Sequence, residues 1–119
     1  IQAVSPQTSY RLQNYLFATV NAEGQNAKPK LVTAGGKTAT AQTGTFRDGE
    51  EINYGWFVGF ASMENPKYAV VVITEDAESG NVNASPVFAE IADGIALLEE
   101  ERGNDWAVDK PEESGYNEE

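Results

Sequence analysis

The sequence contains no cysteine and no histidine among its 119 residues. Without cysteine the chain can form no disulfide and offers no thiolate to a metal ion or a haem. Without histidine it lacks the imidazole on which Ser-His-Asp and Cys-His catalysis depend. We therefore expect neither a metal site nor a cofactor in this chain.

Basic residues are also scarce. Eight Lys and Arg residues stand against 19 Asp and Glu residues, which gives a formal net charge of -11. A polyanion repels such a surface, so nucleic acid is not an expected partner. Hydrophobic runs are short, and none approaches the roughly 18–20 residues that a membrane span needs. The length is typical of one domain.

The acidic residues gather at the end of the chain. Residues 99–119 hold nine acids and two bases, a charge of -7, whereas the other 98 residues carry -4. A segment so charged and so poor in aliphatic residues cannot bury enough apolar surface to fold. We predict a folded region over 1–102 and a disordered acidic tail over 103–119. The alternative for the tail is an acidic docking arm anchored by Trp106 or Tyr116.

Two helices are predicted, one near each end of the folded region. The first covers residues 5–23, where Ser5 can cap the first turn and Pro6 suits the first helical position. The second begins at Ser85-Pro86 by the same signal, and Gly94 in its middle is expected to pack closely on a sheet. Each helix has an apolar stripe that we expect to face the core. The stripes comprise Leu12, Tyr15, Leu16, Thr19 and Val20 in the first helix, and Val87, Phe88, Ile91, Ala92, Ile95 and Leu98 in the second.

Three strands are predicted between the helices, over 37–46, 54–61 and 68–75, because these segments alternate or are rich in β-branched and aromatic residues. Asp48-Gly49 marks a turn that Glu50 and Glu51 would widen. The third strand is apolar on both faces, so we expect cover on both sides. Short connections imply antiparallel neighbours. The predicted fold class is α+β, an antiparallel sheet of about three strands flanked by an N-terminal and a C-terminal helix.

The run Gly35-Gly36-Lys37-Thr38 is similar to the end of a phosphate-binding P-loop. That motif needs a glycine five residues before its second glycine, and this position is Leu31. It also needs a helix after the lysine, whereas the residues after Lys37 favour a strand. Nucleotide binding is therefore not expected.

Lys37, Thr38 and Thr40 favour a carboxylate receptor at the start of an edge strand. The ammonium group supplies charge and the hydroxyl groups supply directed donors. Ala39 is small enough to let the backbone of a ligand approach, so a peptide could add to the sheet. From the residues alone, the simpler alternative is a solvated edge strand that its charge protects from aggregation.

Several segments in order resemble the C-terminal part of the catalytic domain of a penicillin-binding protein, the D,D-transpeptidase of bacterial cell-wall synthesis. The resemblance covers most of residues 4–98. Its motifs are 5-SPQTSYRLQNYL-16, 34-AGGKTATAQTG-44, 55-GWFVGFA-61, 69-AVVVIT-74 and 79-SGNVNASPVFAEI-91. The second of these looks like the family's Lys-Thr-Gly-Thr-Ala-Gln motif.

The resemblance implies roles for four residues. Lys37 would act in catalysis and bind the carboxylate of the stem peptide or of a β-lactam. The hydroxyl groups of Thr38 and Thr40 would hydrogen-bond that carboxylate, with Ala39 beside them. The Thr40 amide would be one of two donors to the oxyanion, and losing such a donor typically costs about 10²–10³ in rate.

Two features depart from the family's pattern. Ala39 stands where most members have Gly, which narrows the approach or tilts the strand, and we expect the change to be tolerated. No Ser is followed by Lys at the third position, so the nucleophile motif is absent. Ser79-Gly80-Asn81 matches the closing turn and not the family's Ser-x-Asn motif. Residues 1–102 of this chain thus resemble the C-terminal part of a larger transpeptidase domain, and we expect this part to be inactive alone.

The resemblance also implies partners and a location. The parent would cross-link peptidoglycan stem peptides ending in D-Ala-D-Ala through an acyl-serine, bind β-lactams, and work outside the bacterial cell membrane on an N-terminal anchor. The chain would pack against the rest of its own domain. Without that part, the open edge of the strand at 68–75 would favour self-association. The alternative function is a non-catalytic peptide-binding or sensory module that uses the edge of 37–46.

Overall fold

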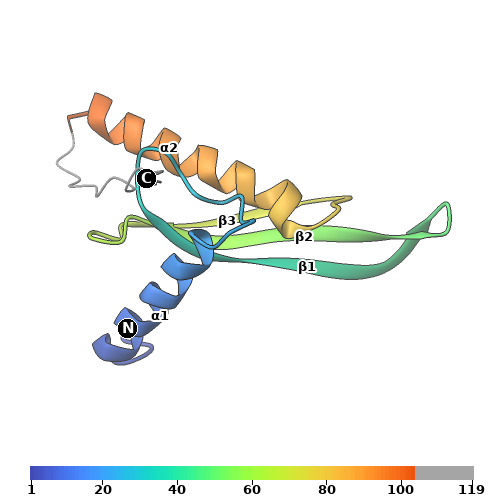
Figure 1. Cartoon of the computed structure of the whole chain (residues 1–119), viewed down its shortest axis with the longest axis horizontal. Coiled ribbons are helices and arrows are strands. Elements are labelled where there is room, and N and C mark those ends of the chain that lie inside the picture. Colours follow the sequence, from blue (N-terminus) through green and yellow to red (C-terminus); the bar gives the residue numbers. More distant parts are fainter. Residues whose placement is uncertain (104–119) are drawn as a thin grey trace, which may run out of the picture.

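The computed structural model describes residues 1–103, which form a three-stranded antiparallel sheet with one helix on a face and another beside its edge (Figure 1). This confirms the predicted fold class. In chain order the elements are α1 (Pro6–Val20), β1 (Ala34–Arg47), β2 (Glu50–Ala61), β3 (Tyr68–Thr74), the π-helical turn η1 (Gly80–Ala84) and α2 (Ser85–Glu101). The acidic tail predicted over 103–119, with Trp106 and Tyr116, lies outside the described residues apart from Gly103.

The strand order is β1-β2-β3, so consecutive strands are neighbours. β1 and β2 form a long hairpin closed by Asp48 and Gly49, whose φ angles are +52° and +84°. Two left-handed residues in a row close a hairpin tightly. The prediction that Glu50 and Glu51 widen this turn is therefore wrong: both belong to β2, where they pair with Arg47 and Phe46.

The core lies between the sheet and α2. The rings of Phe57 on β2 and Phe88 on α2 have their centroids 4.3 Å apart, and both side chains are fully buried. Only a narrow stripe of α2 is buried, at Ser85, Phe88, Ala92, Ala96 and Glu99. The wider apolar face predicted for this helix is thus only partly right, because Val87, Ile91 and Leu98 lie on its flanks and are 38–44% exposed. A single helix on a sheet covers no more than such a stripe.

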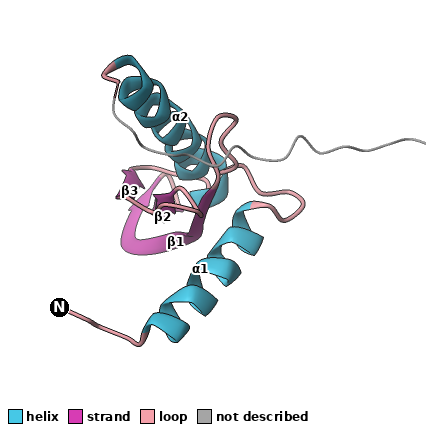
Figure 2. Cartoon of the chain, turned by 90° about the vertical axis from the view of Figure 1, so that its left-hand side faces the viewer, coloured by secondary structure: helices cyan, strands magenta, loops and turns pink. Residues whose placement is uncertain are grey.

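α1 begins as the sequence predicts. Ser5 Oγ accepts a hydrogen bond from the Thr8 amide at 3.2 Å, and Pro6 occupies the first turn. The predicted core stripe is wrong over most of the helix, since Leu12 is 48% and Tyr15 69% exposed and only Val20 is buried. The reason is visible in Figures 1 and 2, where α1 touches the sheet near its C-terminal end and projects away from it.

The start of α2 differs from the prediction. Ser85 does not cap this helix, because the chain is already helical through η1. The cap lies earlier, where Ser79 Oγ accepts a hydrogen bond from the Val82 amide at 3.1 Å. Gly94 is also placed differently from the prediction: it is exposed, and a Cβ atom there would meet nothing within 4 Å.

The third strand is covered on one face only. Val72 faces α2 and is buried, whereas Val71 and Ile73 on the other face are 57% and 51% exposed. The expected cover on both sides is thus absent from residues 1–103. α2 lies over one face of the sheet (Figure 2). α1 reaches the opposite face only near Gly35, where a Cβ atom added to the glycine would lie 3.1 Å from the Phe17 amide nitrogen.

Candidate ligand site at the outer edge of strand β1

The four predicted site residues are consecutive positions of an edge strand. Lys37, Thr38, Ala39 and Thr40 all lie within β1, which pairs only with β2 in the described sheet. The register sets Lys37 opposite Val58 and Ala39 opposite Trp56, on the face away from α2. Since side chains alternate along a strand, Thr38 and Thr40 start on the α2 face.

The side chains of Lys37 and Thr38 start on opposite faces of the sheet, but their polar groups come together at the free edge of β1. The Lys37 ammonium donates to the Thr38 carbonyl oxygen at 3.1 Å and lies 3.4 Å from Thr38 Oγ1. Both groups are at or near the surface. The edge of β1 therefore carries a positive charge next to a hydroxyl donor, an arrangement that suits an anionic oxygen.

Thr40 is held by the turn that follows β3. Its Oγ1 accepts a hydrogen bond from the Gly80 amide at 3.2 Å, which leaves its own O–H free to donate. Backbone groups of residues two apart in a strand point the same way. The Thr40 amide thus faces the same free edge as the Thr38 carbonyl that Lys37 contacts.

Gly80 packs directly against the backbone of β1 and β2 next to the candidate site, a role that the sequence alone did not indicate. A Cβ atom at Gly80 would lie 2.4 Å from the Ala39 carbonyl oxygen and 2.6 Å from that of Trp56. Only glycine allows η1 to approach this closely. The sequence signal was the short motif Ser79-Gly80-Asn81, whose other members are also structural. Asn81 Oδ1 accepts from the Asn26 amide at 3.0 Å, which ties η1 to the loop after α1.

Gly35 and Gly36 are explained by packing against aromatic rings. A Cβ atom at Gly35 would lie 2.6 Å from the Phe60 ring, and one at Gly36 would lie 2.4 Å from the Phe57 ring on the opposite face. β1 continues through Lys37 to Arg47 with no helix after the lysine. The glycine pair thus lets β1 lie flat between two rings, and the P-loop alternative has no structural counterpart here.

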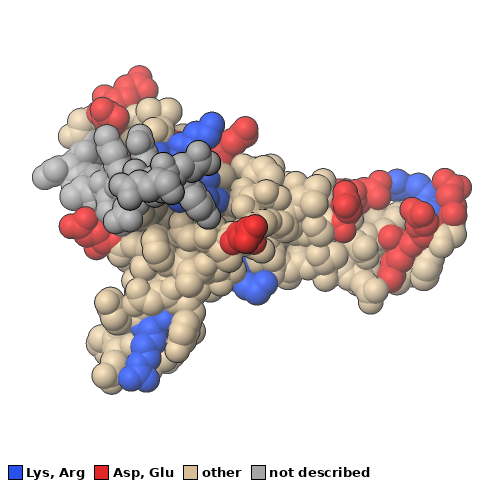
Figure 3. Space-filling view, in the orientation of Figure 1, with Lys and Arg blue, Asp and Glu red and all other residues tan. Residues whose placement is uncertain are grey.

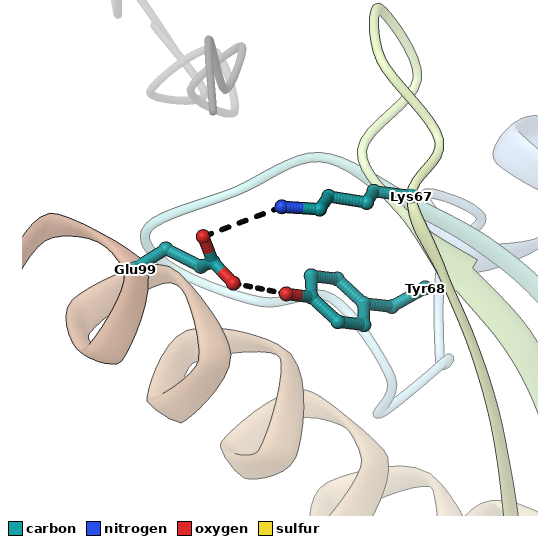
Figure 4. Close-up of polar contacts among 3 residues, drawn as sticks. All are labelled: Lys67, Tyr68 and Glu99. Atoms are coloured by element: carbon teal, nitrogen blue, oxygen red, sulfur yellow. Dashed lines mark hydrogen bonds and ion pairs between the residues drawn. The ribbon is translucent and has the colours of Figure 1, made fainter. Parts of the chain in front are cut away.

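A second polar cluster, which the sequence analysis missed, joins α2 to the start of β3 (Figure 4). The Tyr68 hydroxyl donates a hydrogen bond to Glu99, and the Lys67 ammonium lies 3.5 Å from the other carboxylate oxygen. The same ammonium group lies 5.5 Å from the centroid of the Tyr68 ring. Glu99 is only 7% exposed, so these partners compensate a carboxylate removed from water.

The hydrogen bond to Glu99 raises the pKa of Tyr68 above its usual value near 10. Burial and the negative charge of Glu99 act in the same direction, and Lys67 opposes them. The cluster therefore keeps the phenol protonated and fastens the last turn of α2 to the sheet. It lies on the α2 face, whereas Lys37 belongs to the opposite face, so we assign it a structural role.

The described part of the chain shows no group of three potential metal-ligating side chains. Nor does either helix within residues 1–103 combine the length and hydrophobicity required to cross a bilayer.

Comparisons with known proteins identify the family of the chain. Residues 1–93 match the family described as penicillin binding protein transpeptidase domain. The chain is 29% identical over 92 residues to the peptidoglycan D,D-transpeptidase MrdA of Haemophilus influenzae, a match that spans 66% of this chain and 14% of the relative. It is 31% identical over 91 residues to the peptidoglycan D,D-transpeptidase PbpA of Mycolicibacterium smegmatis, spanning 72% of this chain and 18% of that protein.

Two solved structures are similar. The D,D-transpeptidase domain of a peptidoglycan glycosyltransferase from Eggerthella lenta has a TM-score of 0.60 and 32% identity, with 87% of this chain and 22% of that chain covered. A peptidoglycan synthetase from Bifidobacterium adolescentis superposes with a TM-score of 0.74 at 16% identity, with 96% of this chain and 21% of that chain covered. At this low identity the match supports the fold alone. The chain thus spans about a fifth or less of the length of these proteins. With a family match over residues 1–93 and a strand edge that carries the expected lysine, the chain belongs to the penicillin-binding protein transpeptidase domain family.

Proposed function

We propose that residues 1–102 of this chain form the C-terminal segment of the catalytic domain of a serine-type D,D-transpeptidase. The parent enzyme would cross-link peptidoglycan stem peptides and bind β-lactams. In the parent protein, a serine oxygen attacks the carbonyl carbon of the penultimate D-Ala and expels the terminal D-Ala. An amine of a second stem peptide then takes the acyl group and releases the serine. The proposal places this reaction outside the bacterial cell membrane.

The proposed role of the chain is to hold the terminal carboxylate of the substrate. The Lys37 ammonium would pair with this carboxylate, and the Thr38 and Thr40 hydroxyl groups would donate hydrogen bonds to it. The Thr40 amide would be one donor to the oxyanion. The observation that carries the proposal is the proximity of the Lys37 ammonium and the Thr38 hydroxyl at an unpaired strand edge.

Ala39 sets how closely a ligand can lie against β1. Its methyl group is on the same face as Lys37 and is exposed, opposite Trp56 on β2. The strand is straight enough here to keep its full register with β2 from Ala34 to Gln42. This supports the expectation that Ala in place of the family's Gly is tolerated.

The chain supplies the carboxylate site but no nucleophile. Ser5, Ser9, Ser62, Ser79, Ser85 and Ser114 are its serines, and none has Lys three residues later. The serine would come from the rest of the transpeptidase domain, which would pack against the face that carries Lys37. The isolated chain would therefore bind a substrate weakly and not react with it.

The proposal predicts selective, non-covalent binding by the 119-residue chain. An acylated D-Ala-D-Ala peptide should shift the backbone amide resonances of residues 37–40 in an NMR titration. The same peptide with an amidated C-terminus should not shift them, because the carboxylate is the recognised group. Lys37→Ala should abolish the shifts, whereas Lys28→Ala, which removes an exposed lysine with the same change in net charge, should leave them intact.

Fluorescent penicillin supplies the second readout. We expect no covalent labelling of the chain on a denaturing gel, and labelling would contradict the proposed absence of a nucleophile. Equal binding of the free and amidated peptides would contradict the carboxylate site. It would instead favour a non-catalytic peptide-binding or sensory module, which uses the backbone of 37–46 for strand addition and has no need of the lysine.

A further inference from the structure

The hydrogen bond between Gly80 and Thr40 ties the candidate site to an element that is distant in the sequence. The Gly80 amide donates to Thr40 Oγ1 at 3.2 Å, across 40 positions of the chain. A threonine hydroxyl has one proton to donate and two lone pairs that accept. Because the Gly80 amide occupies one lone pair, the hydroxyl proton of Thr40 must point elsewhere. Thr40 is exposed, so this proton is available to a ligand.

The position of the Gly80 amide depends on where η1 lies. Gly80 is buried, and a Cβ atom on it would lie 2.4 Å from the Ala39 carbonyl oxygen and 2.6 Å from that of Trp56. η1 is therefore already as close to the backbone of the sheet as a glycine allows, and it has room to move only away from it. The contacts that prevent this movement also keep the amide on Thr40 Oγ1.

Asn81, the next residue in η1, makes three hydrogen bonds with the loop after α1. Its Oδ1 accepts from the Asn26 amide at 3.0 Å, its Nδ2 donates to the Gly24 carbonyl oxygen at 2.8 Å, and its carbonyl oxygen accepts from the Asn26 side chain at 3.1 Å. The loop is itself fixed, because Ala27 is 1% exposed and belongs to the core between the sheet and α2. The Asn81 side chain thus connects η1 to a rigid part of the fold.

We propose that Asn81 is a positioning residue for the carboxylate site. By fastening η1 to the loop after α1, it holds the Gly80 amide on Thr40 Oγ1 and keeps the Thr40 hydroxyl directed at the terminal carboxylate of a stem peptide. The identity of this ligand rests on the proposed function. Asn81 does not touch the ligand, and its whole effect passes through Gly80 and Thr40.

The size of the effect follows from the rotamers of Thr40. A side chain has three staggered wells about χ1, so without the Gly80 contact the fraction in the donating rotamer falls to as little as about a third. The apparent Kd is the intrinsic Kd divided by the competent fraction, and it should rise about threefold.

NMR scalar couplings to Thr40 Cγ2 measure this rotamer in the 119-residue chain without any ligand. We expect one rotamer in the unaltered chain and averaging over several rotamers in Asn81→Ala. The Gly80 amide should also exchange its hydrogen faster in this variant, because its acceptor is no longer held in place.

Two further variants make the rotamer test specific. Asn26→Ala removes the side-chain donor to the Asn81 carbonyl oxygen, and it should shift Thr40 in the same direction even if Asn81→Ala does not fold. Asn14→Ala is the matched control. It removes an exposed asparagine whose Nδ2 donates to the Tyr10 carbonyl oxygen at 2.9 Å within α1, and it should leave Thr40 in one rotamer.

Titration with the acylated D-Ala-D-Ala peptide tests the consequence for binding. The Kd should rise in Asn81→Ala and not in Asn14→Ala. Thr40→Val removes the hydroxyl and keeps the shape of the side chain. In that background Asn81→Ala should weaken binding no further, because it acts only through the missing hydroxyl. Equal weakening in both backgrounds would indicate a general loss of structure and would overturn the inference.

The two readouts separate this inference from the proposed function. A single, unchanged Thr40 rotamer in the folded Asn81 and Asn26 variants would overturn positioning by Asn81, whether or not the peptide binds. Averaging already present in the unaltered chain would overturn it as well. Failure of the unaltered chain to bind the peptide would count against the carboxylate site alone, since averaging of Thr40 in Asn81→Ala would still support its positioning.

Discussion

At the scale of single residues, the chain contains a buried carboxylate whose partners both come from another element. Glu99 on α2 meets Lys67 and Tyr68 at the start of β3 (Figure 4). Removing one partner from a buried charge costs more than the pair itself contributes, because the remaining charge is poorly solvated. This cluster is therefore more sensitive to substitution than the exposed pair between Arg47 and Asp76, whose side chains are 63% and 61% exposed.

The raised pKa of Tyr68 predicts a loss of stability in alkali. The pKa of Tyr68 is higher in the folded chain than its value of about 10 in the unfolded chain. The hydrogen-bonded phenol therefore contributes its full stabilisation below about pH 10, and this contribution is lost as the pH rises through the pKa of the folded state. Tyr68→Phe should lower the free energy of unfolding at pH 7, and the difference from the unaltered chain should shrink above pH 10. Urea denaturation of both proteins at several pH values measures this difference in the free energy of unfolding.

Tyr15→Phe serves as the control, since Tyr15 is 69% exposed on α1. Its small effect should be the same at pH 7 and above pH 10. A constant difference for Tyr68→Phe across the same range would contradict the proposed role of the hydrogen bond to Glu99.

Sequence patterns predicted some of these residues and not others. Lys37 was identified because its neighbours in the chain complete a motif, and Ser5 because capping is a local interaction. Glu99 was not identified, because it stands in a run with Glu100 and Glu101 and nothing in the sequence distinguishes the three. Only the position of α2 on the sheet buries the first of them and exposes the others.

At the scale of elements, glycines show how the same residue type serves opposite purposes. Gly36 lies in β1 against the Phe57 ring, where a Cβ atom would be 2.4 Å away. Gly94 lies in α2 with open space around it. In a strand the glycine permits close packing, whereas in the helix it only adds backbone freedom to the unfolded chain.

The two glycines predict substitutions of opposite sign. Gly94→Ala should raise the free energy of unfolding by about 1 kcal/mol, because alanine favours the helix and meets no neighbour. Gly36→Ala should lower it by about 1–3 kcal/mol, because the added methyl group displaces the Phe57 ring from the core. Thermal or urea unfolding of both variants checks the prediction, and destabilisation by Gly94→Ala would show that α2 packs differently.

The elements were predicted more reliably than their surroundings. All three strands and both helices were placed within a few residues, because periodicity and turn signals are short-range. The prediction that the apolar stripe of α1 is buried was wrong. Such a stripe shows that one face of a helix can be buried, but it does not show which element, if any, packs against that face. The two-residue turn at Asp48 and Gly49 was recognised, but its tightness depends on backbone angles that the sequence specifies only indirectly.

At the scale of the whole molecule, charge and apolar surface are separated. Figure 3 shows acidic side chains gathered at the distal end of the β1–β2 hairpin and around α2, with a largely uncharged region between them. The hairpin end carries Asp48, Glu50 and Glu51 beside Arg47, and Asp76, which follows β3, pairs with that arginine. Negative charges held close together repel one another and oppose the compact state.

The net charge of -11 predicts that salt stabilises the folded chain. Raising NaCl from about 0.01 M to about 0.3 M shortens the Debye length from about 30 Å to less than 10 Å, which screens repulsion between acidic groups on separate elements. The opposing loss is small, because an exposed pair such as Arg47 with Asp76 contributes only about 0–1 kcal/mol. The free energy of unfolding should therefore increase with salt. Measuring it at several protein concentrations separates this effect from any association between chains, and a decrease with salt would show that attractive pairs dominate.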